Sequence, residues 1–277
     1  MSLEKLVIKI NYLNSIWANS WIGVKDVFES CLERLGPVDS TAKDAERNFT
    51  LLNAGLSVAN FIEYSGRKMA RDNREPNYHS RLHTAVAIEC LTALIVEQRR
   101  IDQNNSKTIA TNELLALVAM TAHDAGHNGT RNTTICQLEA RSFDLIEPLL
   151  QDAQCDAHDI YSIKRIIWST DPALYSGLHR GAAASAFNLN YPVWQAVICQ
   201  EADILASALP QFEEELTREL ASEWRKLDPV SAEGLLSARG RKYFLTHFAK
   251  FSTPASSSLG LQKLSLIHIS EPTRRTP

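Results

Sequence analysis

The sequence predicts an all-α protein, folded as a multi-helical bundle. Apolar residues recur at intervals of three and four positions in several segments, as they do along one face of an α-helix. No segment shows the strict apolar and polar alternation of a half-buried strand. Short runs of turn-forming residues separate the segments, so the connections are loops between helices and not domain linkers. The helical segments are residues 24–35, 51–62, 82–96, 114–122, 160–168 and 191–205.

The organisation along the chain follows from these segments. A chain of 277 residues, 44% of them hydrophobic, can bury a large core. We expect one helical catalytic unit over residues 1–263, built from an N-terminal helical wall (1–75), a core that carries the site (76–210) and C-terminal helices (211–263). Residues 264–277, LSLIHISEPTRRTP, resemble the translated read-through of a sequencing adapter. We expect this tail to be non-native and give its His268 no role.

Composition excludes several classes of partner. The net charge of −3 and the absence of a Lys/Arg run give no basic field for polymeric nucleic acid or an anionic membrane surface. The five cysteines are scattered singly, which indicates reduced core residues. No segment has 18 uninterrupted apolar residues, and the N-terminus is a poor signal peptide. We therefore expect a cytoplasmic protein that binds neither polymeric nucleic acid nor a membrane, and composition predicts no oligomeric state.

Two histidine clusters give the first functional signal. His79 and His83 lie four positions apart, so on a helix they would share one face. Alone, such a pair is more often an ordinary surface or core feature. His123 and Asp124 end the very apolar run ELLALVAMTA, which predicts a central, buried helix. A carboxylate in apolar surroundings costs several kcal/mol unless it is paired, and a metal ion would pair both side chains.

A third segment supplies a further carboxylate. The apolar stretch VWQAVICQEADI carries Glu201 and Asp203, of which Asp203 is the better candidate to face inward. The four candidate metal ligands are His83, His123, Asp124 and Asp203. A mixed imidazole and carboxylate set suits zinc, manganese or iron better than an all-oxygen magnesium cage, and Asp124 could bridge to a second ion.

These residues belong to a longer series of motifs. In order, the motifs are Tyr78-His79 to His83, His123-Asp124 to His127 and on to Asn132, Leu138-Glu139, Ile166 to Asp171, and Ala202-Asp203. Their order and spacing resemble the signature blocks of class I 3′,5′-cyclic nucleotide phosphodiesterases, a branch of the HD-type metal-dependent phosphohydrolases. The resemblance covers about residues 75 to 210.

The resemblance implies a two-metal hydrolase. His83, His123, Asp124 and Asp203 would hold Zn²⁺ at the first site, and Asp124 would bridge to Mg²⁺ or Mn²⁺ at the second. His79 would be the general acid on the leaving 3′ oxygen, and Tyr78 beside it would contact the substrate. Residues that support the metal ligands or hold metal-bound water would be His127, Asn132, Glu139, Thr170 and Asp171. The reaction would convert cyclic AMP, cyclic GMP or both to 5′-monophosphates.

The chemistry accounts for this set of side chains. A hydroxide shared between two cations is a strong nucleophile at neutral pH, because the metals lower the pKa of their bound water. The leaving alkoxide needs a proton, which an uncoordinated imidazole can supply. We therefore expect His79 to be free and His83 to be bound to metal.

The chain departs from the family at several positions outside the expected ligands. Ser80 replaces a usual Asn, Val86 and Gly126 replace Asp residues, and Arg141 or Ser142 stands where a further histidine is common. The glutamine and aromatic clamp that read the purine base in the family have no recognisable counterpart here. The sequence therefore does not choose between cyclic AMP and cyclic GMP.

Two other functions stay open. An HD phosphohydrolase of another nucleotide or phosphate ester would use the same metals, and a polyphosphate substrate would need a basic pocket. Only four arginines are available for such a pocket, namely Arg81, Arg131, Arg165 and Arg180. The second alternative, from a different class, is a catalytically silent ligand-binding HD domain, supported mainly by the departures from the family motifs.

Overall fold

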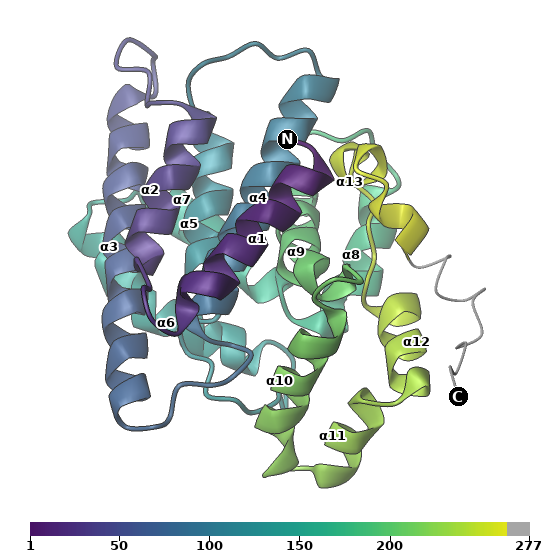
Figure 1. Cartoon of the computed structure of the whole chain (residues 1–277). Helices are drawn as coiled ribbons and strands as arrows, with labels where there is room; N and C mark the ends of the chain where they lie inside the picture. Colours follow the sequence, from purple (N-terminus) through teal and green to yellow (C-terminus); the bar gives the residue numbers. More distant parts are fainter. Residues whose placement is uncertain (265–277) are drawn as a thin grey trace.

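The computed structural model describes residues 1–264, and over this range it contains helices and no strand. The prediction of an all-α fold is confirmed (Figure 1). The α-helices are α1 (Leu3–Trp17), α2 (Val24–Leu35), α3 (Ala45–Arg71), α4 (Arg81–Ile101), α5 (Thr111–Ala122), α6 (Gln137–Asp152), α7 (Ala157–Ser169), α8 (Tyr175–Ala182), α9 (Pro192–Ala208), α10 (Glu213–Arg225), α11 (Pro229–Leu235), α12 (Ala238–His247) and α13 (Pro254–Ser258). Two 3₁₀ helices, η1 (Pro172–Leu174) and η2 (Leu261–Lys263), complete the described chain. The expected non-native tail lies outside the described residues, apart from Leu264.

Five of the six predicted segments lie entirely within helices, namely α2, α3, α4, α5 and α7. The sixth, 191–205, lies in α9 except for Tyr191, which is the N-cap of that helix. The segment in α2 agrees at both ends. The segment in α3 covers less than half of that helix, which runs from Ala45 to Arg71. The reason is that the ends of α3 are polar and partly exposed, so they carry no apolar periodicity.

The centre of the molecule is formed by α4, α5 and α9, and the neighbouring helices cover them. Every residue of α5 from Glu113 to Ala122 is buried, as expected for a helix that is apolar on nearly every side. Helix α4 packs against α1, α2, α5 and α9, while α3 and α7 pack against α5. Figure 1 shows α1 crossing in front of this centre and α10 to α12 grouped at the C-terminal side. No helix in residues 1–264 has the length and apolar character needed to cross a bilayer.

A fully buried carboxylate ties the C-terminal segment to α9. Glu201 accepts hydrogen bonds from the Thr253 backbone amide at 2.8 Å and from the Thr253 hydroxyl at 2.5 Å, and the Ser252 amide and the Ser256 hydroxyl donate to it as well. Because residues two apart point to nearly opposite sides of a helix, this orientation of Glu201 turns Asp203 to the other side.

Candidate metal centre

The structure brings the four candidate metal ligands together. His83 Nε2 lies 3.0 Å from Asp203 Oδ1 and 3.3 Å from Asp124 Oδ2. His123 Nε2 lies 3.1 Å from Asp124 Oδ2 and 3.4 Å from Asp203 Oδ1. Ligand atoms of His83, His123 and Asp203 all lie within 4.8 Å of one another. Two imidazole nitrogens and two carboxylates thus converge on one small volume from three helices.

Local sequence signals place these side chains. Ser80 is the N-cap of α4, and its hydroxyl accepts a hydrogen bond from the His83 amide, so His83 lies in the first turn. His123 follows the last residue of the apolar helix α5, which delivers the His123–Asp124 pair to the centre of the molecule. Because α4 begins only at Arg81, the premise that His79 and His83 share a helix face is wrong. His79 lies in the loop before the cap.

The donor set fits a divalent cation. Among residues 1–264, His123 Nε2 and Asp124 Oδ2 are buried and make no hydrogen bond, although buried polar atoms normally have a partner. Burial by itself would raise the pKa of Asp124, but the neighbouring imidazoles His123 and His79 hold that pKa well below its usual range. Burial would likewise raise the pKa of Asp203, but His123 and His83 lower it. Both carboxylates are therefore ionised and available to a cation, which imidazole and carboxylate ligands suit.

A second group of side chains lies beside these four residues. His79 Nδ1 lies 2.7 Å from Glu223 Oε2 of α10, and the other carboxylate oxygen of Glu223 accepts from the backbone amides of Tyr78 (2.6 Å) and His79 (2.8 Å). The Glu223 side chain is only 2% exposed. Burial would raise the pKa of Glu223, but the hydrogen bond and the charge of His79 lower it. Glu223 therefore fixes the ring of His79 and leaves Nε2 without a hydrogen bond among the described residues.

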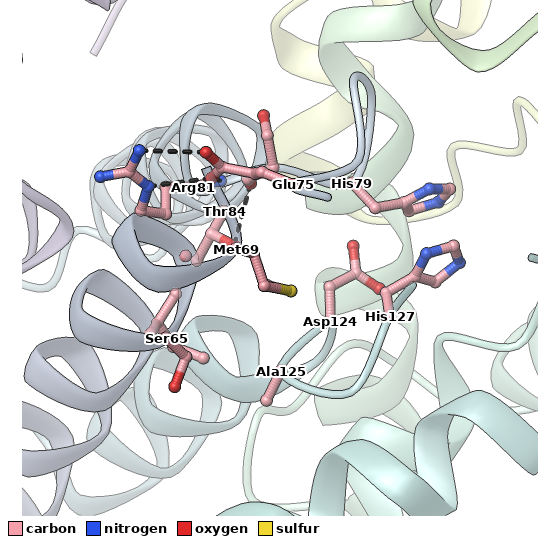
Figure 2. A pocket seen from close by; sticks show the side chains of 12 residues that line it. Ser65, Met69, Glu75, His79, Arg81, Thr84, Asp124, Ala125 and His127 are labelled. Carbon is pink, nitrogen blue, oxygen red and sulfur yellow. Dashed lines mark hydrogen bonds and ion pairs between the residues drawn. The ribbon is translucent and has the colours of Figure 1, made fainter. Parts of the chain in front are cut away.

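His127 stacks on His79. The ring centroids are 3.4 Å apart and the ring planes differ by 20°. Figure 2 shows the two rings next to each other, with the Asp124 carboxylate beside them, in a pocket whose opposite wall carries Ser65 and Met69 of α3. Burial and the neighbouring His79 lower the pKa of His127 to about 3. His127 is therefore neutral, and its Nδ1 accepts a hydrogen bond from the Gly129 amide at 3.1 Å.

Two further sequence-predicted residues form a pair. The Asn132 amide donates to both carboxylate oxygens of Glu139, at 2.9 and 3.2 Å. Burial raises the pKa of Glu139 to about 7, and the Asp171 and Asp124 carboxylates contribute to the rise. A carboxyl group with such a pKa can hold or release a proton near neutral pH.

Thr170 and Asp171 are buried, and within the described chain none of their hydrogen bonds is to one of the four candidate ligands. The Thr170 hydroxyl donates to Ile167 O of its own helix. Asp171 accepts from the Cys136 amide at 2.6 Å and from the Ala173 amide at 2.9 Å, so it links η1 to the start of α6.

Two tyrosines flank the candidate ligands, and only one was predicted. The ring of Tyr78 lies 4.7 Å from that of His83, and its hydroxyl is 2.8 Å from Ser207 Oγ. Tyr175 was not predicted, and its buried hydroxyl donates to Asp203 Oδ2 at 3.1 Å. Glu223 was not predicted either, because it lies 144 positions from His79 in a polar helix without a metal-ligand motif.

The structure also explains one departure from the family motifs. The Gly126 amide donates to the Ser142 hydroxyl at 2.9 Å, so the loop after Asp124 lies directly on α6. A Cβ atom at position 126 would come within 2.8 Å of the Ser142 backbone and the Arg141 side chain. Glycine and serine at these positions are therefore a matched pair.

Comparisons with known proteins agree with the fold. No family model and no curated protein matches the sequence. Two solved structures match it with a probability of 1.00. One is the phosphodiesterase domain of the RhoPDE fusion protein from the choanoflagellate Salpingoeca rosetta, with 16% identity, a TM-score of 0.52, and coverage of 87% of this chain and 90% of that one. The other is LmjPDEB1 in complex with IBMX, with 14% identity, a TM-score of 0.54, and coverage of 89% and 94%. The chain therefore has the fold of the class I phosphodiesterase catalytic domains.

Proposed function

We propose that residues 1–263 form a catalytic unit that hydrolyses 3′,5′-cyclic nucleotides, cyclic AMP, cyclic GMP or both, to 5′-monophosphates. The observation that carries the proposal is the presence of two distinct groups side by side. Four side chains converge as a ligand set. A separate imidazole, His79, is held by a buried carboxylate, and its Nε2 makes no hydrogen bond among the described residues. Hydrolysis of an ester with a poor leaving group requires both an activated nucleophile and an acid.

In this proposal the converging residues hold the metals. His83, His123, Asp124 and Asp203 would hold Zn²⁺, and Asp124 would also reach Mg²⁺ or Mn²⁺ at a second site. When bound, these cations lower the pKa of water and neutralise charge on the phosphoryl oxygens. Glu139 can carry a proton near neutral pH, and the Asn132 amide orients its carboxyl group. We therefore propose that these two residues order water next to Asp124.

His79 would donate a proton from Nε2 to the 3′ oxygen as the bond between phosphorus and that oxygen breaks. The Glu223 carboxylate stabilises the protonated ring and fixes its orientation. The neutral His127 stacked on it cannot take up the proton, because the pKa of His127 is about 3. Tyr78, whose ring lies beside those of both His79 and His83, is the proposed contact to the substrate. Thr170 and Asp171 keep a proposed supporting role behind the site.

Two of the four arginines considered for a basic pocket already bind carboxylates, which favours a substrate with a single phosphate. Arg81 is bound by Glu63 at 2.6 Å and by Glu75 at 2.8 Å, and Arg131 is paired with Asp228 at 2.6 Å. Side chains already paired with carboxylates do not supply the free positive charge that a polyphosphate needs. A nucleoside triphosphate or an alarmone is therefore a poorer fit than a cyclic monophosphate.

The test is hydrolysis of cyclic AMP and cyclic GMP by the purified protein, after chelation and again with Zn²⁺ plus Mg²⁺ or Mn²⁺ restored. We expect the 5′-monophosphate to appear only with metal. Asp124→Ala should lose bound metal and turnover together, whereas His79→Ala should keep its metal and lose turnover. Metal binding without hydrolysis of either nucleotide by the unmodified protein would contradict the proposal.

A further inference from the structure

Helix α10 contacts both loops that carry the site. The loop before α4 is bound to it, because Asn77 Nδ2 donates to Ser222 Oγ at 2.8 Å and the amides of Tyr78 and His79 donate to Glu223. The loop that follows the His123–Asp124 pair also contacts it. The end of α10 therefore determines where the Glu223 carboxylate meets His79.

The loop after Asp124 contacts the same end of α10 through two residues. Gly129, with a φ of +78°, lies against Glu223, and a Cβ atom there would be 3.8 Å from Glu223 Cγ. Arg131 reaches further along the helix. Its guanidinium carbon lies 4.7 Å from the centre of the Trp224 ring, and its Nη2 is 2.6 Å from Asp228 Oδ2.

The contacts of Arg131 are of a kind that fixes a helix end. A planar guanidinium can lie over an indole ring and bind a carboxylate at the same time, which lysine does less well. Trp224 is the residue directly after Glu223, and Asp228 is the N-cap of α11, where it accepts from the Ser231 amide at 2.9 Å. Arg131 thus restrains both the residue next to Glu223 and the turn that ends α10.

We infer that Arg131 is a positioning residue for the general acid: by holding Trp224 and Asp228, it keeps the Glu223 carboxylate against His79 without touching the substrate. This inference rests on the proposed function for its effect on turnover. It also has a structural consequence that can be measured without any substrate. The backbone amides of Tyr78 and His79 donate to Glu223, so they should be protected from hydrogen exchange.

The first experiment is therefore hydrogen exchange on the peptide that spans residues 77–80, in the full chain. In Arg131→Ala, the amide hydrogens of this peptide should exchange faster than in the unmodified protein. The matched control is Arg225→Ala, which removes an exposed arginine at the end of α10. Among the described residues, this arginine forms an ion pair only with Glu233. The control variant should leave the exchange unchanged. Equal exchange in Arg131→Ala and the unmodified protein would overturn the inference, whatever the activity of the protein.

The second experiment separates acid catalysis from general damage to the fold. Cyclic AMP has an alkoxide leaving group that needs a proton, whereas bis(p-nitrophenyl) phosphate releases a phenolate that does not. With metals bound, Arg131→Ala should lower kcat for cyclic AMP by about tenfold, with little change in KM. A loss of this size is expected when a catalytic group is slightly misplaced. Its kcat for the p-nitrophenyl ester should stay within about twofold of the unmodified value.

Arg131→Lys should recover part of the loss, because it keeps the ion pair to Asp228 but not the flat contact with Trp224. Equal losses on both esters would indicate a purely structural role and would refute the inference. Absence of both cyclic AMP and cyclic GMP hydrolysis by the unmodified protein would instead refute the proposed function, and the exchange experiment would still decide the role of Arg131.

Discussion

The bond between Glu223 and His79 allows the contribution of a single charge to be predicted. Glu223→Gln keeps the shape of the side chain but removes the negative charge. It also replaces one of the two acceptor oxygens by an NH₂ group, so it cannot accept both from His79 Nδ1 and from the backbone amides of Tyr78 and His79. The carboxylate lies 2.7 Å from Nδ1 and is almost fully buried, so solvent screens the interaction little. Hydrogen bonds to charged groups contribute about 1.5–3 kcal/mol and neutral ones about 0.5–1.5 kcal/mol.

From the middle of these ranges, the expected loss is at least about 1.2 kcal/mol, which corresponds to at least about an eightfold lower kcat for cyclic AMP. His79→Ala removes the proton donor itself and should lower kcat by about 10²- to 10⁴-fold. The assay is steady-state hydrolysis with saturating metal, together with bis(p-nitrophenyl) phosphate, on which both variants should retain most of their activity.

The control for Glu223→Gln is Glu214→Gln, one charge removed from the same helix at a side chain that is 87% exposed and pairs only with Arg218. It should leave kcat unchanged. The reasoning would be refuted if Glu223→Gln kept full activity on cyclic AMP, or if it lost activity equally on the ester that needs no acid.

Two further predictions concern stability. Burial lowers the pKa of His179 to about 4. The folded protein therefore keeps this ring neutral while the unfolded chain protonates it below about pH 6.5. The stabilisation is present at neutral pH and is lost as pH falls, by about 2 kcal/mol between about pH 8 and about pH 5. Urea unfolding at the two pH values should show this loss, and His179→Gln should reduce the slope; an unchanged slope would argue against a buried neutral ring. Gly55→Ala would place a Cβ atom 2.4 Å from Phe28 Cζ and should destabilise the core by about 1–3 kcal/mol in the same measurement. Gly177→Ala, with nothing within 4 Å, should be neutral or slightly stabilising, and equal effects of the two glycine variants would contradict the packing argument.

Sequence patterns predict the main residues of the candidate metal centre. The two imidazoles and two carboxylates that meet in the structure all stand at the ends of, or inside, strongly apolar segments, and burial of a charged group in such a segment is itself a signal. The choice of Asp203 over Glu201 as the inward residue agrees with the structure. The physical reason could not be predicted from the sequence, because Glu201 accepts hydrogen bonds from the segment around Thr253, some fifty positions later.

The sequence by itself determined the helical class, six of the helices and the residues that converge as candidate metal ligands, because these depend on local periodicity and on short-range motifs. Tertiary structure alone decided the partners of the residues in the motifs. Glu223 meets His79, Tyr175 meets Asp203 and Trp224 meets Arg131 through contacts between distant segments. Glu223, Tyr175 and Trp224 come from positions outside the motifs, and their roles are set by how the helices pack.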